Sequence, residues 1–295
     1  MSGIMYYSAE AFLTYGEQMA EEEDKSQMEK NMRVVDNLAR IKHKVVVMSG
    51  KGGVGKSTVA VNLALMLAET GKKVGVMDVD IHGPDVAMLL GVQGQRLQST
   101  GDMIVPVKVK ENLSAISMAF LLEDRDTPVV WRGPLKMSAI QQFLGEVAWG
   151  DLDYLVIDLP PGTGDEPLSV AQLITDGAWA VVVTTPQDVA LLDSRKAIRF
   201  AEMLKMKVAG VIENMSGFEC PHCGEQIDLF KTGGGEAAAR EMGVNFLGRV
   251  PIDPQMVKMG DMGQPYVLDE PEEKGPKAFR EIAKALVERV EAEEG

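Results

Sequence analysis

The chain of 295 residues has few cysteines, and this excludes one class of architecture. Its two cysteines, Cys220 and Cys223, lie three positions apart. A pair this close cannot staple a small fold with several disulfides. The chain is therefore not a disulfide-bonded secreted scaffold.

Basic residues are also scarce: 30 lysines and arginines stand against 44 acidic residues, a net charge of −14. Nucleic acids and anionic membranes attract basic patches, so this balance argues against a general affinity for either. The first basic residue is Lys25, which leaves no cationic region for a secretory signal. No segment approaches the roughly 20 apolar residues of a membrane span. We expect a cytoplasmic protein with neither nucleic acid nor membrane as a partner.

The composition, 45% hydrophobic and 25% charged, is that of an ordinary globular chain. Residues 1–40 differ from the rest: several aromatic side chains are followed by an acidic run at 21–24, which we interpret as a solvated surface. An apolar spacing from Met28 to Ile41 predicts a helix. We interpret residues 1–40 as an N-terminal appendage, partly helical or disordered, and residues 41–295 as one domain.

From residue 44 onward, strand-like runs alternate with helical ones. The predicted strands are residues 45–48, 73–77, 113–118, 154–158, 178–184, 208–213 and 246–250. The predicted helices are residues 58–68, 135–147, 168–174, 189–204, 236–242 and 279–290. This alternation is typical of βαβ units and predicts an α/β fold: a mostly parallel twisted sheet with helices on both faces.

A phosphate-binding loop stands between the first predicted strand and helix. Residues 50–58 read G-K-G-G-V-G-K-S-T and fit the pattern G-x-x-x-x-G-K-[ST]. Backbone N–H groups and a helix N-terminus converge on phosphate oxygens in such a loop. Lys56 is expected to neutralise the β- and γ-phosphates, and Ser57 to ligate Mg²⁺. The predicted nucleotide contacts are Gly50, Lys51, Gly52, Gly53, Val54, Gly55, Lys56, Ser57 and Thr58.

Lys51 occupies a position that the general pattern leaves free. A cation on the rim of the loop reaches its own nucleotide poorly, but it can reach a nucleotide on a facing subunit, as an arginine finger does. The alternative is a solvated surface lysine. The whole loop resembles the deviant phosphate-binding loop of the MinD/ParA/nitrogenase-reductase class of dimerising ATPases. That resemblance implies a P-loop NTPase fold, a homodimer, and a catalytic Lys51 that crosses the dimer interface.

Two further acidic segments complete the predicted nucleotide site. Asp158 ends an apolar strand before a Pro-Pro-Gly turn, the form of a Walker B carboxylate that holds Mg²⁺ through its water shell. Asp78 and Asp80 follow a second strand, and the carboxyl ends of neighbouring parallel strands share the ligand crevice. A turn or helix-capping aspartate is the alternative. The class resemblance favours a catalytic, water-positioning Asp80 with Asp78 supporting the metal; His82 has no assigned role.

Asn214 follows another predicted strand, where its amide is expected to hydrogen-bond adenine. The resembled class carries an asparagine at a comparable place. The sequence contains no N-K-x-D motif for guanine, so ATP is favoured over GTP.

The segment Cys220-Pro-His-Cys223 supplies two thiolates on one tight loop near 218–226, half of a four-thiolate metal site. Because the chain has no other cysteine, the other half needs a second copy, which a twofold dimer provides. A [4Fe–4S] cluster and a structural zinc both fit four thiolates. A thioredoxin-like dithiol is disfavoured, since no evident helix begins at the pair. His222 is either a further ligand or points away.

Taken in order with residues 130–134, these motifs resemble the Mrp/ApbC/Nbp-type iron–sulfur cluster carrier ATPases over roughly residues 40 to 290. The resemblance implies a homodimeric ATPase with slow hydrolysis that holds a [4Fe–4S] cluster between two subunits and transfers it to apo-proteins. Some relatives carry a cysteine-rich N-terminal site or an extra assembly domain, and residues 1–40 contain neither. The alternative function is a MinD/ParA-like partner-recruiting switch with structural zinc. A nitrogenase-reductase-like electron carrier needs well-separated cysteines, which are absent here.

Overall fold

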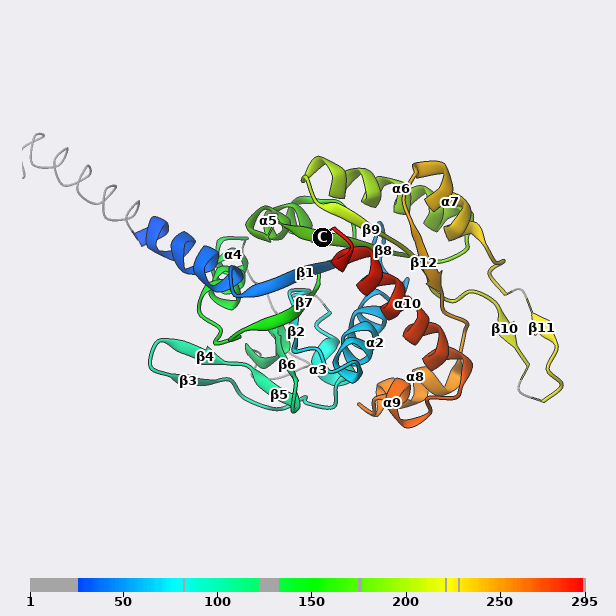
Figure 1. The fold of residues 1–295 in the computed structure, drawn as a ribbon, viewed down its shortest axis with the longest axis horizontal. Helices are drawn as coiled ribbons and strands as arrows, with labels where there is room; N and C mark the ends of the chain where they lie inside the picture. The colour runs from blue at the N-terminus through cyan, green and yellow to red at the C-terminus, as the bar shows by residue number, and fades with distance from the viewer. Residues whose placement is uncertain are drawn as a thin grey trace, which may run out of the picture.

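The computed structural model describes residues 26–81, 83–121, 133–174, 177–220, 222–227 and 229–293. Its centre is an eight-stranded sheet in the order β12-β9-β8-β1-β7-β2-β6-β5 (Figure 1). Neighbouring strands are parallel except β5, which pairs antiparallel with β6 at one edge. The strands are β1 (Ile41–Met48), β2 (Val74–Asp78), β5 (Val107–Lys110), β6 (Leu113–Ser117), β7 (Leu152–Asp158), β8 (Ala178–Thr184), β9 (Lys207–Glu213) and β12 (Phe246–Arg249).

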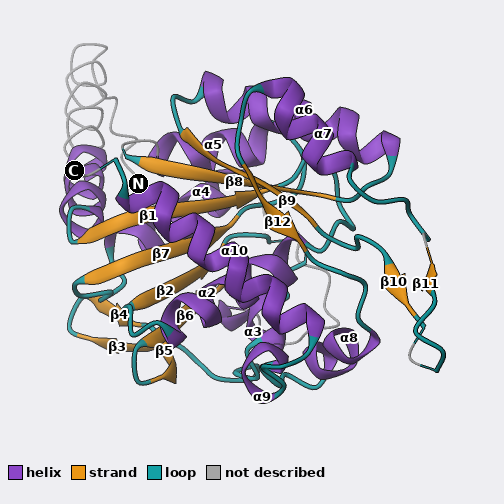
Figure 2. Ribbon diagram, turned by 45° about the vertical axis from the view of Figure 1, so that its right-hand side comes forward, coloured by secondary structure: helices purple, strands orange, loops and turns teal. Residues whose placement is uncertain are grey.

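Helices cover both faces of this sheet (Figure 2). One layer contains α2 (Lys56–Glu69), α3 (Val86–Leu89), α8 (Pro254–Asp261), α9 (Tyr266–Asp269) and α10 (Lys274–Glu291). The other contains α4 (Gly133–Gly145), α5 (Asp165–Ile174), α6 (Asp188–Met203) and α7 (Gly234–Met242).

The strand β1 shows how one sequence serves both layers. Val45 and Val47 pack in the α2 layer, whereas Val46 and Met48 pack in the α4 layer. Successive strand side chains point to opposite faces, so a sheet covered on both sides requires continuous apolar runs rather than alternation. The predicted fold class, a mostly parallel sheet between helices, is confirmed.

Every predicted strand is a strand of the main sheet, with boundaries displaced by a few residues. The sequence analysis did not predict the hairpin of β3 (Gln98–Thr100) and β4 (Met103–Val105), the edge strand β5, the 3₁₀ turn Met118–Leu121, or the short helices α3, α8 and α9. Both strands are three residues long, shorter than the runs of four to eight residues that indicate a strand, and β3 is wholly polar and exposed.

The described part of the N-terminal segment, helical over residues 26–38, packs on the end of α4. Val34 and Leu38 are buried in the cluster that contains α4. The Asn37 side-chain amide donates to the carbonyl oxygens of Leu144 and Val147 at 2.7 and 2.9 Å. The acidic run at 21–24 lies outside the described residues, and the boundary at residue 40 stays a prediction.

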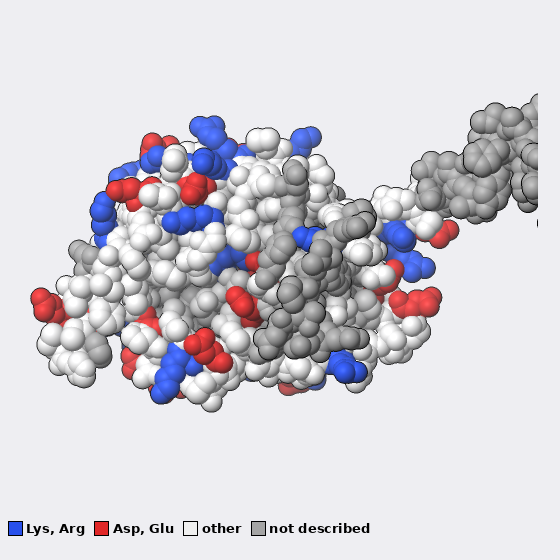
Figure 3. All heavy atoms as spheres, turned by 180° about the vertical axis from the view of Figure 1, so that it is seen from behind, with Lys and Arg blue, Asp and Glu red and all other residues white. Residues whose placement is uncertain are grey.

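The surface mixes both signs of charge. Figure 3, which views the molecule from behind Figure 1, shows lysine and arginine side chains interspersed with aspartate and glutamate. Surface ion pairs include Arg195–Glu241 and Lys231–Asp188. In the part of the chain that the structure describes, no helix has the length and hydropathy needed to cross a bilayer.

Candidate functional site

The predicted nucleotide segments meet at the carboxyl ends of three adjacent strands, β1, β7 and β2. The register places Asp78 at the end of β2 directly beside Asp158 at the end of β7. The loop of residues 50–55 leaves the end of β1 and enters α2 at Lys56. Such a junction of parallel strand ends is where open α/β sheets bind ligands. The sheet topology therefore brings together three segments that lie far apart in sequence.

Two glycines of the loop are required by close packing. Gly55 caps α2 with φ of 78°, and a Cβ there would lie 2.2 Å from the Asn214 side-chain nitrogen. A Cβ on Gly50 would lie 2.1 Å from the carbonyl oxygen of Asp193 in α6. Glycine adopts left-handed φ and tolerates such approaches because it has no Cβ. These two glycines let the loop pack against the end of β9 and against α6.

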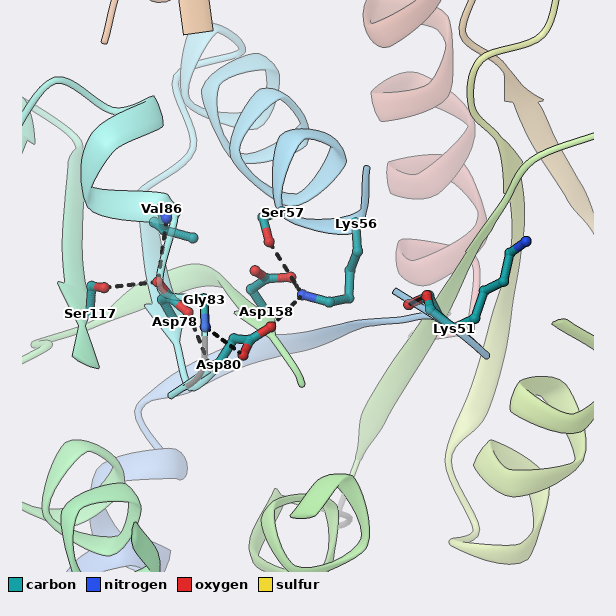
Figure 4. Close-up of polar contacts among 10 residues, drawn as sticks. Lys51, Lys56, Ser57, Asp78, Asp80, Gly83, Val86, Ser117 and Asp158 are labelled. Atoms are coloured by element: carbon teal, nitrogen blue, oxygen red, sulfur yellow. Dashed lines mark hydrogen bonds and ion pairs between the residues drawn. The ribbon is translucent and has the colours of Figure 1, made fainter. Parts of the chain in front are cut away.

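Lys56 and Asp158 form the centre of the site (Figure 4). The Lys56 Nζ lies 2.6 Å from Asp158 Oδ1, 3.3 Å from Ser57 Oγ and 4.0 Å from Asp80 Oδ2. The Lys56 side chain is 5% exposed and that of Asp158 is fully buried. Burial raises the pKa of Asp158, and the Lys56 charge opposes that rise.

Asp158 also carries an unsatisfied oxygen. Its Oδ2 is buried and has no hydrogen-bond partner. Buried polar atoms are rarely left without a partner, because the desolvation of such an atom is not compensated. This oxygen, with the nearby Ser57 hydroxyl, fits the oxygen-ligand chemistry of Mg²⁺ and its water shell.

Asp78 and Asp80 shape the loop after β2. Asp78 Oδ2 accepts from the Ser117 hydroxyl at 2.8 Å and from the Val86 backbone N–H at 3.3 Å, and its Oδ1 accepts from the Asp80 N–H at 3.1 Å. Burial and the neighbouring Asp158 charge raise the pKa of Asp78 well above its ordinary value. Asp78 therefore ties this loop to β6 and α3, whereas Asp80 faces Lys56. His82 lies outside the described residues.

Lys51 does not join this cluster. Its side chain extends away from Lys56 and Asp158 (Figure 4). Its carbonyl oxygen accepts from the Ser49 hydroxyl at 2.9 Å, which fixes the backbone of the loop while the amine projects outward. The Lys51 side chain thus points away from the carboxylates of its own chain, and its position relative to a bound nucleotide and the role of its amine stay predictions.

A cavity of about 230 Å³ opens beside the loop and is lined in part by Asn214. The Asn214 side-chain nitrogen donates to the Val54 carbonyl at 2.9 Å, while its buried Oδ1 has no partner. The sequence analysis missed much of the lining: Met215, Phe230, Pro251, Ile252, Asp253, Met256 and Val257. The segment Pro251–Asp253 was detectable, because it follows a predicted strand at the same edge of the sheet.

The two cysteines lie on a hairpin that projects from the body of the fold, formed by β10 (Phe218–Glu219) and β11 (Gln226–Ile227) (Figure 1). Cys220 is half-buried and Cys223 is exposed. The Cys220 N–H donates to the Glu225 carbonyl and the Gly224 N–H to the Cys220 carbonyl, both at 2.9 Å. These bonds close a tight loop around the thiols, and the next described helix along the chain, α7, begins at Gly234.

The loop favours a thiolate at Cys220. Backbone N–H groups of His222 and Cys223 hydrogen-bond its sulfur and lower the pKa of the Cys220 thiol. Metal ligation requires the thiolate form. Among the described residues of one chain, no group of three or more His, Cys, Asp or Glu side chains is placed to hold a metal ion.

Comparison with known proteins agrees with these features. The ParA family model described as NUBPL iron-transfer P-loop NTPase matches residues 40–287. The iron-sulfur cluster carrier protein of Methanocaldococcus jannaschii is 49% identical over 263 residues, covering 89% of this chain and 90% of the relative. The cytosolic Fe-S cluster assembly factor NUBP2 of Rattus norvegicus is 45% identical over 260 residues, covering 87% and 96%.

Two solved structures are also similar to the chain. A nucleotide-binding protein from Archaeoglobus fulgidus in complex with ADP has a TM-score of 0.73 at 40% identity, covering 84% of this chain and 96% of its own. MinD of Pyrococcus horikoshii with Mg-ADP has a TM-score of 0.61 at 26% identity, covering 82% and 94%. These matches confirm the resemblance inferred from the motifs. The chain belongs to the NUBPL iron-transfer family of ParA-type P-loop NTPases.

Proposed function

We propose that this chain is an ATP-dependent iron–sulfur cluster carrier. In this proposal a homodimer holds one [4Fe–4S] cluster between the Cys220 and Cys223 thiolates of both copies and transfers it to apo iron–sulfur proteins. The observation that carries the proposal is the projecting hairpin, with an exposed Cys223 and a Cys220 sulfur that receives backbone N–H groups, on a chain with a P-loop. The names of the relatives support the same function.

The nucleotide part of the proposal assigns ATP to the P-loop and its base to the cavity beside Asn214. Mg²⁺, held by Ser57 and through water by Asp158, would screen the phosphate charge when bound. On nucleotide binding, the Lys56 amine would leave Asp158 and pair with the β- and γ-phosphates. Asp80 would hold the attacking water. The unpartnered Oδ2 of Asp158 and the 4.0 Å approach of Asp80 to Lys56 support these roles.

The dimer part of the proposal assigns Lys51 to the nucleotide of the facing copy. Its side chain extends away from its own carboxylate cluster, which leaves the amine free to approach from outside. The hydrolysis step would then depend on dimerisation, and slow hydrolysis is expected in an isolated subunit.

In the metal part of the proposal the cluster is cargo rather than a resident cofactor. Two thiolates per copy make the four ligands of a [4Fe–4S] cluster, and an exposed thiolate permits exchange with the cysteines of a recipient. Zinc fits the same ligands. A cytoplasmic location, supported by the cytosolic NUBP2 relatives, is part of the proposal.

The test is iron and acid-labile sulfide analysis of protein reconstituted anaerobically, beside the variants Cys223→Ala and His222→Ala. The proposal expects about four irons and four sulfides per dimer. Cys223→Ala should lose them, and the control His222→Ala should keep them. One zinc per dimer with no sulfide after reconstitution would favour the alternative, an ATP-dependent partner-recruiting switch.

A further inference from the structure

One buried carboxylate contacts both arms of the cysteine hairpin. The outgoing arm is residues 214–217, and the returning arm is residues 229–235. Glu213, the last residue of β9, is 0% exposed. Its Oε1 accepts from the Ser216 hydroxyl at 2.5 Å on the outgoing arm and from the Gly233 N–H at 2.9 Å on the returning arm. Its Oε2 accepts from the Gly235 N–H at 2.5 Å. The two ends of the segment that carries Cys220 and Cys223 are therefore joined through a single side chain.

The fit around this carboxylate is close. A Cβ added to Gly235 would lie 3.0 Å from the Glu213 Cβ and 3.1 Å from its Oε2. Gly233, at φ of 83°, caps α7, so two N–H groups at the start of a helix point at the acid. The positive end of a helix dipole stabilises a buried negative charge. Glutamate is thus matched to this position by its charge and by its length.

Both arms also contain strained backbone. Among the described residues, left-handed φ occurs outside glycine at Met215 (57°), Lys231 (68°) and Lys205 (59°). Met215 lies on the outgoing arm and Lys231 on the returning arm. Non-glycine residues rarely adopt this conformation and keep it where the surrounding structure enforces it. Each arm of the hairpin therefore contains one residue in a conformation that its surroundings hold.

The same arms form a wall of the nucleotide-side cavity. Asn214 and Met215 of the outgoing arm and Phe230 of the returning arm line the cavity with Gly55 and Thr58 of the P-loop segment. A ligand in the cavity thus contacts residues adjoining both ends of the cysteine segment. Glu213 immediately precedes Asn214, which lines the cavity.

We propose that Glu213 is a positioning residue that couples occupancy of the cavity to the geometry of the cysteine hairpin. This proposal rests on the proposed function, because it concerns nucleotide control of the cluster. Two sites are coupled only where each ligand prefers one arrangement of a shared element. The segment from Asn214 to Gly235, held closed by Glu213, is that element. Releasing one arm should leave both sites able to bind while removing the effect of one on the other.

The test compares Glu213→Gln with Glu236→Gln in anaerobically reconstituted dimer. Glutamine matches the size of Glu213, but its amide nitrogen cannot accept an N–H. Glu236 is an exposed acid in the first turn of α7, paired with Arg249, so its variant changes charge on the same helix without touching the arms. The readout is the ratio of the equilibrium affinities for iron, measured by chelator competition with and without ATP, together with ADP affinity by calorimetry.

We expect wild type and Glu236→Gln to show the same nucleotide ratio, within the 5- to 150-fold range of about 1–3 kcal/mol typical of coupled sites. Glu213→Gln should load iron and bind ADP within about twofold of wild type, while its ratio falls to within about twofold of one. An unchanged ratio in Glu213→Gln overturns the positioning role and leaves the proposed function intact. Failure of wild type to load iron and sulfide overturns the proposed function itself, and the positioning role with it.

Hydrogen exchange on the wild-type protein tests the idea without any variant. We expect the Gly233 and Gly235 amides to be strongly protected, and ADP to change exchange in the hairpin at 218–227. Unchanged hairpin exchange on saturation with ADP would also overturn the proposal.

Discussion

Lys56 and Asp158 form a buried ion pair, with Nζ 2.6 Å from Oδ1, where the ends of β1, β7 and β2 meet. The pair joins the P-loop to the strand end predicted to hold the metal. A buried charge that loses its partner is strongly destabilising, by about 3–5 kcal/mol, whereas removing both charges can be nearly neutral. The nucleotide-free protein should therefore depend on this pair for stability.

We predict that Lys56→Met lowers the free energy of unfolding by about 3 kcal/mol. The double variant Lys56→Met/Asp158→Asn should regain at least about 1 kcal/mol, because it also removes the buried Asp158 charge that Lys56→Met leaves without its ion-pair partner. Urea unfolding of the nucleotide-free proteins measures both values. Additive losses would contradict the account. Both variants should lose ADP binding by calorimetry.

Lys51 is predicted to act on hydrolysis and not on binding. Lys51→Ala should keep ADP affinity within about twofold and lower ATP turnover by about 10³-fold, the lower bound for a cation supplied in trans. Lys108→Ala, an exposed lysine of β5, is the control and should leave turnover unchanged. A large loss of ADP affinity in Lys51→Ala would place the amine on its own nucleotide instead.

Gly55 and Gly94 allow a matched test of packing in the P-loop. Their φ values are 78° and 77°, but a Cβ would lie 2.2 Å from Asn214 at Gly55 and meets nothing within 4 Å at Gly94. Alanine at Gly94 should cost about 1–2 kcal/mol for left-handed backbone alone. Alanine at Gly55 should cost about 1–3 kcal/mol more and abolish nucleotide binding. Equal losses of unfolding free energy would show that the clash with Asn214 has no effect.

A pH-dependent contact ties α10 to the sheet. Glu291 accepts from Lys72 at 2.7 Å and from the Tyr154 hydroxyl at 3.0 Å, and these bonds, Lys72 first, lower the pKa of Glu291. An acid with a lowered folded-state pKa adds stability above its ordinary pKa of 4.5 and loses it as pH falls through the lowered value. Half-exposed pairs contribute about 0.2–1 kcal/mol.

We therefore expect Lys72→Met to lower the unfolding free energy by about 0.2–1 kcal/mol at pH 7 and by less near pH 3. Urea unfolding at both pH values measures this difference. A loss that does not shrink at low pH would show that Lys72 acts through its alkyl chain rather than its charge.

The sequence predicted the central strands well because a doubly covered sheet imposes continuous apolar runs such as 154–158 and 178–184. It predicted the P-loop because that conformation needs glycine at fixed spacing. It missed β3 and β4, which are only three residues long, and α3, which is too short for a helical period.

The wall of the cavity beside Asn214 was missed for a different reason. Met256 and Val257 of α8 read as ordinary apolar residues, although Asp253 caps that helix by accepting from the Gln255 N–H at 2.9 Å. Their approach to Asn214 depends on the order of β9 and β12 in the sheet, which local patterns do not specify. Glu213 was likewise invisible, because its partners Gly233 and Gly235 become neighbours only after the hairpin forms.

Cluster transfer tests the central claim most directly. Reconstituted dimer would be mixed anaerobically with an apo [4Fe–4S] protein and ATP, in the presence of a chelator that traps free iron, and recipient activity followed over time. The account predicts that wild-type protein activates the recipient despite the chelator, and that protein with Cys223→Ala does not. Activation that the chelator abolishes would mean that iron reaches the recipient only from solution, which would contradict a carrier.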